Sequence, residues 1–176
     1  MKEHPEELKI VRLSSHKMYI GEFKEGRCQG RSVLIFKNGN IYEGMMEGNR
    51  RQGRGVYLQA GVGWFKGTFA NDLKSDTGIE VVYFKWAFSG HFTNGLRHDK
   101  GLYVEKGSTA YQGQWKLGIM HGKGTLKTSQ FTYQGMLVNS LKHGQGEERL
   151  TNGDAYKGDY QNNRFDGFGT YTWKQG

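Results

Sequence analysis

Proline, cysteine and long apolar runs are scarce in this sequence, and each shortage excludes some classes of protein. Proline occurs once in 176 residues, as Pro5, which suits an extended β structure because proline interrupts sheet hydrogen bonding. Cys28 is the single cysteine, so no internal disulfide can form and a reducing compartment is favoured. No apolar stretch approaches the ~20 residues of a membrane helix, and the first residues, MKEHPEELK, look like neither a signal nor a transit peptide. We therefore expect a cytoplasmic or cytoskeletal protein.

Apolar side chains in general are also scarce, at 35% of the residues, while glycine occurs 28 times. An ordinary two-layer core is therefore undersupplied, and the aromatics, at 14%, must provide most of the buried surface. A disordered chain would be poor in aromatics, so we interpret the glycines as structural.

The net charge of +8 is spread along the chain. Residues 1–88 hold 14 Lys or Arg and 10 Asp or Glu, and residues 89–176 hold 11 and 7, so each half carries +4. The one local basic group is Arg50, Arg51 and Arg54. This distribution favours a solvated surface over a membrane site. Because no motif that reads RNA or DNA accompanies the charge, we expect no nucleic-acid partner.

A pattern of about 23 residues repeats through the chain. An aromatic residue followed two places later by glycine recurs at intervals of 23, 23, 23, 23, 22 and 23 residues. We call these aromatics the ring residues: Tyr19, Tyr42, Phe65, Phe88, Tyr111, Tyr133 and Tyr156. Counting positions from the ring residue, position 4 is large in every repeat: Phe23, Met46, Phe69, Phe92, Trp115, Leu137 and Tyr160. Position 13 is glycine in six of seven repeats, with Ser32 as the exception.

Positions 0, 2 and 4 share one face of a β-strand, because side chains alternate between the faces. The glycine between two large side chains gives a neighbouring ring space to lie over the backbone. The other face of these strands is mostly polar, as in Gln112 and Gln114 or Lys157 and Asp159. We therefore expect each strand to be buried on one face only.

A turn and a second strand complete each repeat. The turns are predicted at segments such as GIMHG (118–122), and Asn38-Gly39 and Asn152-Gly153 are strong signals for a closing turn. The predicted fold is all-β: an elongated single-layer antiparallel sheet of about seven β-hairpin repeats plus an N-terminal half-repeat cap. The predicted boundaries are 1–17 for the N-terminal segment and capping strand, and 18–40, 41–63, 64–86, 87–109, 110–131, 132–154 and 155–176 for the repeats. Residues 8–16 align with the second strand of a repeat, and residues 1–7 are predicted to be frayed or to begin a helical turn at Pro5.

The third and fourth repeats depart from the pattern. Asp76 and Asp99 stand where the turn glycine is expected, and the link EVVYFKWAF (80–88) carries no turn signal. We expect distorted hairpins there and a bend in the sheet.

Three patterns that suggest chemistry have simpler explanations. The run from Gly118 to Gly124 lacks both the spacing and the Ser or Thr of a phosphate-binding loop. His98, His121 and His143 share position 10, but hairpins repeat about every 9.6 Å, too far apart to share a metal ion bonded at about 2 Å. We expect these histidines to stabilise turns. Nothing in the sequence would activate Cys28. From these three patterns together we expect no catalytic residue, metal or cofactor.

The pattern Tyr-x-Gly-x-Trp-x-x-Gly-x-x-x-Gly-x-Gly, intact at 111–124 and nearly intact at 19–30, 42–55 and 156–169, resembles the MORN repeat (membrane occupation and recognition nexus). The resemblance covers residues 18–176. It implies a non-enzymatic scaffold or adaptor that mediates protein–protein interactions, as a subunit of a cytoskeletal or ciliary (axonemal) assembly. The family name records a proposal of phospholipid binding, and the alternative is a peripheral membrane module that binds acidic phospholipids. A further alternative is the regulatory array of a larger enzyme.

Four groups of residues are candidate contact sites. The resemblance implies that a partner helix or extended segment lies along an aromatic groove, with a strip of rings left partly accessible. The predicted groove residues are Tyr19, Phe23, Tyr42, Phe65, Phe69, Phe88, Phe92, Tyr111, Trp115, Tyr133, Tyr156 and Tyr160. Tyr83, Phe84 and Trp86 in the irregular link are either buried on both sides or an exposed docking patch. In the membrane alternative, Arg50, Arg51 and Arg54 contact phospholipid. Separately, an unpaired edge at residues 168–173 would support a homodimer.

Overall fold

The computed structural model describes residues 8–174, and every regular element within them is a β-strand. The chain forms two compact units, one ending at Tyr83 and the other beginning at Phe84. Each unit is described by itself. Within residues 8–174 no helix is long and apolar enough to span a membrane. The prediction for residues 1–7 lies outside the described residues.

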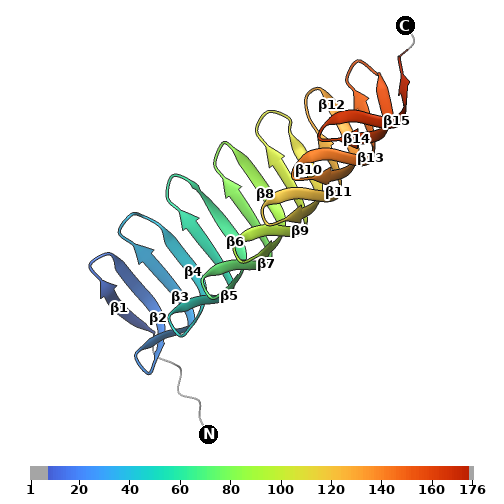
Figure 1. Ribbon diagram of the computed structural model, residues 1–176. Helices are drawn as coiled ribbons and strands as arrows, with labels where there is room; N and C mark the ends of the chain where they lie inside the picture. Colours follow the sequence, from blue (N-terminus) through green and yellow to red (C-terminus); the bar gives the residue numbers. More distant parts are fainter. Residues whose placement is uncertain (1–7, 175–176) are drawn as a thin grey trace. The chain divides into compact units, whose positions relative to one another are not determined.

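Unit 1 is an antiparallel meander in which each strand pairs with the next (Figure 1). Its strands are β1 (Lys9–Ser14), β2 (Lys17–Lys24), β3 (Arg27–Phe36), β4 (Ile41–Glu47), β5 (Arg50–Gln59), β6 (Gly63–Ala70) and β7 (Leu73–Val82). Strand β1 is the predicted capping strand, and it pairs with β2 through Val11 opposite Tyr19.

Unit 2 is built in the same way. Its strands are β8 (Trp86–Thr93), β9 (Leu96–Glu105), β10 (Ala110–Lys116), β11 (Ile119–Lys127), β12 (Phe131–Val138), β13 (Leu141–Leu150), β14 (Ala155–Gln161) and β15 (Arg164–Thr172). The predicted all-β class and its antiparallel hairpin repeats are confirmed in both units.

The hairpin turns lie earlier than the sequence suggests. In the clearest repeat the turn is Leu117-Gly118, with φ angles of 49° and 87°, and β11 already begins at Ile119. Gly122, with φ 67°, sits at a β-bulge instead, because the pairing shifts between Gly113 and Trp115. The prediction that the glycine at position 11 belongs to the turn is therefore wrong. This glycine is needed for the left-handed backbone of the bulge.

The third and fourth hairpins are regular, so the expected distortion is wrong. Asp76 and Asp99 have φ angles of 53° and 56° and adopt the conformation of the bulge glycine. Aspartate tolerates this left-handed region better than most residues, because its side chain can form local hydrogen bonds. In the link, Phe84 has a φ of 58°, whereas glycines take the corresponding positions as Gly61 and Gly107, with φ of 69° and 104°.

Candidate functional site

The face that carries the seven ring residues, here called the ring face, is the core of each unit. In the clearest repeat the Tyr111 ring lies over Gly113 and Gly124, and a Cβ on either would be 2.4 Å from it. The Tyr111 hydroxyl donates a hydrogen bond to the carbonyl oxygen of Gln114 at 2.9 Å. The space left by the glycines is therefore filled, as predicted, although by the ring of the same strand and not by a neighbour's ring.

The position-4 rings link consecutive repeats. In unit 1 Phe69 makes edge-to-face contacts with both Phe65 and Tyr42, each at 5.2 Å between ring centroids. In unit 2 Trp115 contacts both Tyr111 and Phe88 at 5.3 Å. Each of these rings packs against its own ring residue and that of the preceding repeat. Such contacts add about 0.5–1.5 kcal/mol each to the burial of the rings.

As a result, the predicted groove residues are almost inaccessible. Apart from the half-buried Phe23, their exposed fractions do not exceed 8%, which is the value for Tyr156. The expectation of a partly accessible aromatic strip is therefore wrong, except at the half-buried Phe23. The physical reason is that the rings lie flat on the glycine pairs and are covered by the next repeat. Whether they touch a partner remains a prediction.

A second level of side chains lies over the rings at position 9. This position is a cation in four repeats: Arg51, Lys74, Arg97 and Lys142. The Arg51 guanidinium carbon is 4.9 Å from the centroid of Phe69 and 5.1 Å from that of Tyr57. Lys142 Nζ is 3.9 Å from the centroid of Phe131. Cation–π contacts of this kind stabilise partly desolvated sites.

Position 15 matches position 9 in chemical type. Arginine faces tyrosine in Arg51/Tyr57 and Arg97/Tyr103, and lysine forms ion pairs with glutamate in Lys74/Glu80 and Lys142/Glu148. The other pairs are apolar or aromatic: Cys28/Leu34, Met120/Leu126 and Phe165/Tyr171. The sequence interpretation missed this set, although its 23-residue spacing could have revealed it. Except for the buried pairs Cys28/Leu34 and Lys142/Glu148, these side chains are more accessible than the ring residues and form the outer layer of the ring face.

Burial changes the protonation of several groups on the ring face. It raises the pKa of Tyr42 and of Tyr111 to about 12. It also lowers the pKa of Lys142 to about 8, because the charged ammonium loses water. This pKa still lies above neutral pH, so Lys142 keeps its charge there and forms an ion pair with Glu148.

The ring face of unit 1 contains a cavity of about 260 Å³. It is lined by Lys17, Leu34, Phe36, Met46, Asn49, Arg51, Tyr57 and Asp72. In this unit Cys28/Leu34 is the smallest pair at positions 9 and 15, which leaves room beside Leu34. The cavity combines apolar walls with two cations and one carboxylate.

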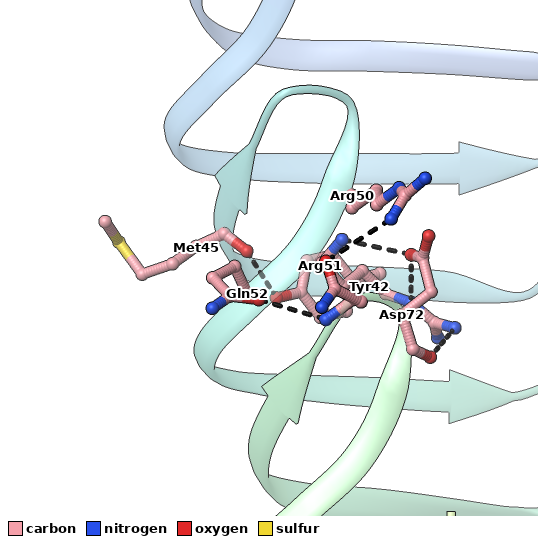
Figure 2. A network of polar contacts seen from close by, with 7 residues as sticks. Tyr42, Met45, Arg50, Arg51, Gln52 and Asp72 are labelled. Atoms are coloured by element: carbon pink, nitrogen blue, oxygen red, sulfur yellow. Dashed lines mark hydrogen bonds and ion pairs between the residues drawn. The ribbon is translucent and has the colours of Figure 1, made fainter. Parts of the chain in front are cut away.

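Arg51 is fixed in this cavity by Asp72. Its Nε donates to Asp72 Oδ1 at 3.1 Å, and its Nη2 donates to the Asp72 carbonyl oxygen at 2.7 Å. Figure 2 shows the Arg51 guanidinium beside Tyr42 and Asp72, whereas the Met45 side chain points away from them. Lys17 Nζ is 5.4 Å from the centroid of Phe36 and has no carboxylate partner within the described part of the chain. Lys17 is thus the cation available to a ligand.

The three arginines of the membrane alternative do not form one surface. Arg51 lies on the ring face, whereas Arg54 is exposed on the opposite face, across from Thr68. Arg50 is exposed, and its Nη1 lies 3.4 Å from Asn71 Oδ1. Adjacent strand positions point to opposite sides, so the local basic group is divided. Its use by phospholipid remains a prediction.

The link residues are also divided. Phe84 is 90% exposed and Tyr83 is 36% exposed. Trp86 is half-buried, and the Arg97 guanidinium carbon is 4.2 Å from its ring centroid. Of the two alternatives for the link, exposure therefore applies to Phe84 and burial to Trp86. Partner binding by these residues is untested.

Two remaining candidates can be placed. His98 lies in β9, and its Nδ1 accepts a hydrogen bond of 3.4 Å from the backbone N–H of Leu117, in the turn of the next hairpin. No three His, Cys, Asp or Glu side chains among residues 8–174 are grouped so that they could hold a metal ion. At the predicted edge, Phe168 and Trp173 are 90% and 70% exposed.

The MORN repeat family model matches residues 19–41, 42–60, 88–104, 111–129, 133–155 and 156–176. These segments cover more than half of the chain, which therefore belongs to the MORN repeat family. The predicted repeat at 64–86 is outside the match, yet β6 and β7 form the same bulged hairpin as the others. A search of curated proteins returned no match. MORN repeats are generally protein- or membrane-interaction modules, and this chain is an array of them.

Proposed function

We propose that this array is a non-enzymatic scaffold that holds a helix or extended segment of another protein on its ring face. The cavity of unit 1 carries the proposal, because side chains leave room over the rings there. A volume of about 260 Å³ is enough for one large side chain of a partner. By the habit of the family, the assembly is cytoskeletal or ciliary and the protein is cytoplasmic.

The cavity also defines the chemistry of the partner segment. Leu34, Phe36 and Met46 provide an apolar wall, while Lys17 provides a cation without a carboxylate partner in the described chain. An apolar side chain next to an acidic one would satisfy both parts. Asp72 already neutralises the charge of Arg51. Arg51 would therefore orient the segment together with Tyr57 and Asp72, and would not attract it by charge.

The test compares proteins that co-purify with the wild-type chain and with variants of the cavity wall. Phe36→Ala and Lys17→Glu change the wall without removing a ring residue. We expect both variants to remain folded and to lose the same partner, which mass spectrometry would identify. An unchanged set of partners would contradict the ring-face proposal. Glu105→Ala in unit 2, an exposed strand residue, is the matched control.

Acidic phospholipid is the second candidate, and the exposed Arg54 supports it. Vesicles containing phosphatidylserine would bind the wild-type chain in a salt-sensitive way, and Arg50→Glu/Arg54→Glu would remove this binding. Binding that persists in the double variant would contradict an arginine-mediated membrane site.

A further inference from the structure

The face opposite the ring face, here called the back face, carries a continuous row of apolar side chains in unit 1. The row crosses β2 to β7 through directly paired residues. Its members are Met18, Ile35, Ile41, Leu58, Trp64 and Val81. Each stands next to a ring-face residue in its strand, so its side chain points to the opposite side. None of the six is buried, and Met18 is 42% exposed.

A second row lies beside the first, about 6.6 Å along the strands. Its members are Ile20, Val33, Glu43, Val56, Lys66 and Ile79. Four of these are aliphatic, so the two rows form one apolar surface. The prediction of a mostly polar face concerned the first strand of each hairpin, whereas in unit 1 the second strand supplies most of these aliphatic side chains.

The corresponding row in unit 2 has a different character. Its members are Ala87, Val104, Ala110, Lys127, Thr132, Arg149, Ala155 and Thr172. The same hairpin thus accepts lysine or arginine at the position that Leu58 occupies in unit 1. The fold does not require the apolar side chains of unit 1, and exposed apolar surface without a structural need is typical of a binding site.

The size of the surface fits one helix. Six strands at ~4.8 Å extend roughly 24 Å, and two rows give a patch of roughly 350 Å². One helix of about 16 residues spans ~24 Å at 1.5 Å per residue, and its apolar stripe can cover the rows.

The charges beside the apolar rows indicate the chemistry of the helix. Arg31 and Arg54 are exposed on the back face, opposite Met45 and Thr68 respectively. Lys66 is also exposed. Nearer the hairpin turns this face also carries Lys24, Arg27 and Arg50. Its acids in β2 to β7 are the exposed Glu43 and Glu47 and the half-buried Glu22, so the cations are in excess. Arg31 and Arg54 lie two strands apart, about 9.6 Å, which equals six to seven residues of a helix.

We propose that the back face of unit 1 binds an amphipathic helix of another protein. The apolar stripe of the helix lies on the row from Met18 to Val81, and acidic residues about seven positions apart face Arg31 and Arg54. This site is separate from the ring-face cavity, so one array can hold two partners. Its success or failure is independent of the ring-face proposal.

A display library of helices of about 16 residues tests the proposal. The apolar stripe is constant, and the flanking positions vary among Glu, Lys and Ser. Selection on the full chain is expected to enrich helices with Glu on one flank. A synthetic copy should bind Leu58→Lys at least about tenfold more weakly than the wild type, through loss of a central apolar contact. Two control variants should bind the synthetic helix with the affinity of the wild type. They are Val104→Lys, at the equivalent position of unit 2, and Phe36→Ala, in the cavity wall.

Four results would overturn the proposal. No helix is enriched, or the enriched helices bind Leu58→Lys as well as the wild type. A wild-type dimer that Leu58→Lys converts to a monomer in sedimentation would assign the face to a second copy. Binding to vesicles of phosphatidylserine and phosphatidylcholine that Leu58→Lys abolishes would assign it to a membrane. Circular dichroism checks that Leu58→Lys is folded. We expect it to be folded because unit 2 has lysine, Lys127, at the equivalent position.

Discussion

The ring faces of units 1 and 2 are alike in their residues and contacts, whereas their back faces differ. On the ring face, Tyr42 in unit 1 and Tyr111 in unit 2 are both 0% exposed, and both hydroxyls donate to a backbone carbonyl three residues further on. On the back face, Leu58 in unit 1 corresponds to Lys127 in unit 2. The hairpin therefore requires the ring and two small residues beneath it, which are glycines except for Ser32, and it leaves the back face free to vary. We therefore expect differences between back-face residues to affect partner binding and not folding.

Removing a ring should have the largest effect and should be equal in the two units. Tyr42→Ala and Tyr111→Ala each leave a cavity between neighbouring rings, so we expect a loss of about 3–5 kcal/mol in the free energy of unfolding. Urea denaturation measures it. Tyr42→Phe and Tyr111→Phe lose only a hydrogen bond and should cost about 1 kcal/mol. A cost below about 1 kcal/mol for the alanine variants would mean that the rings are not the core.

The lysine–glutamate pairs should separate the units. Lys142 and Glu148 in unit 2 are each 11% exposed, whereas Lys74 and Glu80 in unit 1 are 26% and 19% exposed. Glu148→Leu leaves a buried ammonium alone and should cost about 3 kcal/mol, and Glu80→Leu should cost less than half of that.

The double variant Lys142→Met/Glu148→Leu should recover most of the loss. Met120 and Leu126 already occupy these two positions in the preceding repeat, so an apolar pair fits there. The double-mutant cycle is measured by the same urea titration. A loss in the double variant equal to the sum of the losses in Lys142→Met and Glu148→Leu would show that the pair is not coupled.

The pH dependence of stability should show a smaller effect, which depends on Lys142. Its folded pKa of about 8 lies below the ordinary value of 10.5, so between these values the unfolded chain binds more protons. The free energy of unfolding should therefore rise with pH over that window. The pKa of Tyr42 is raised from 10.0 to about 12, so above pH 10 the folded chain binds more protons and stability falls. Lys142→Met should abolish the rise and leave the fall, and a rise that persists would contradict the assignment.

Exchanging back-face residues between the units should have the smallest effect on stability. Leu58→Lys places the residue of β11 into β5, and Lys127→Leu does the reverse. Both positions are accessible, so each change should alter the free energy of unfolding by no more than about 0.5 kcal/mol. Thermal unfolding measures it. A loss above about 2 kcal/mol in Leu58→Lys would show that the apolar row is part of the core.

Much of the fold was predictable because the repeat presents its periodic signals within each hairpin. The aromatic, glycine and large residue of positions 0, 2 and 4 identify the first strand and its ring face. The turn was placed too late, since the glycine at position 11 resembles a turn glycine in sequence and belongs to a bulge. Asp76 and Asp99 occupy the same bulge without glycine, which composition alone does not reveal.

The contact sites were less predictable. The ring residues were expected to be accessible because a single sheet has no second layer, but the position-4 ring of the next repeat and the side chain at position 9 cover them. The cavity in unit 1 depends on the small pair Cys28/Leu34 next to the larger pair Arg51/Tyr57. Both findings involve residues of consecutive repeats, such as Tyr42 and Phe69, which only the pairing of strands brings together.

The sequence by itself determined the family, the number of hairpins and the face on which the rings lie, because side-chain alternation and the 23-residue spacing are local properties of the chain. The tertiary structure decided which of those rings a partner could reach and where an apolar surface remains. These depend on contacts between successive repeats and on directly opposed residues in neighbouring strands. The row from Met18 to Val81 is continuous only after the strands have paired.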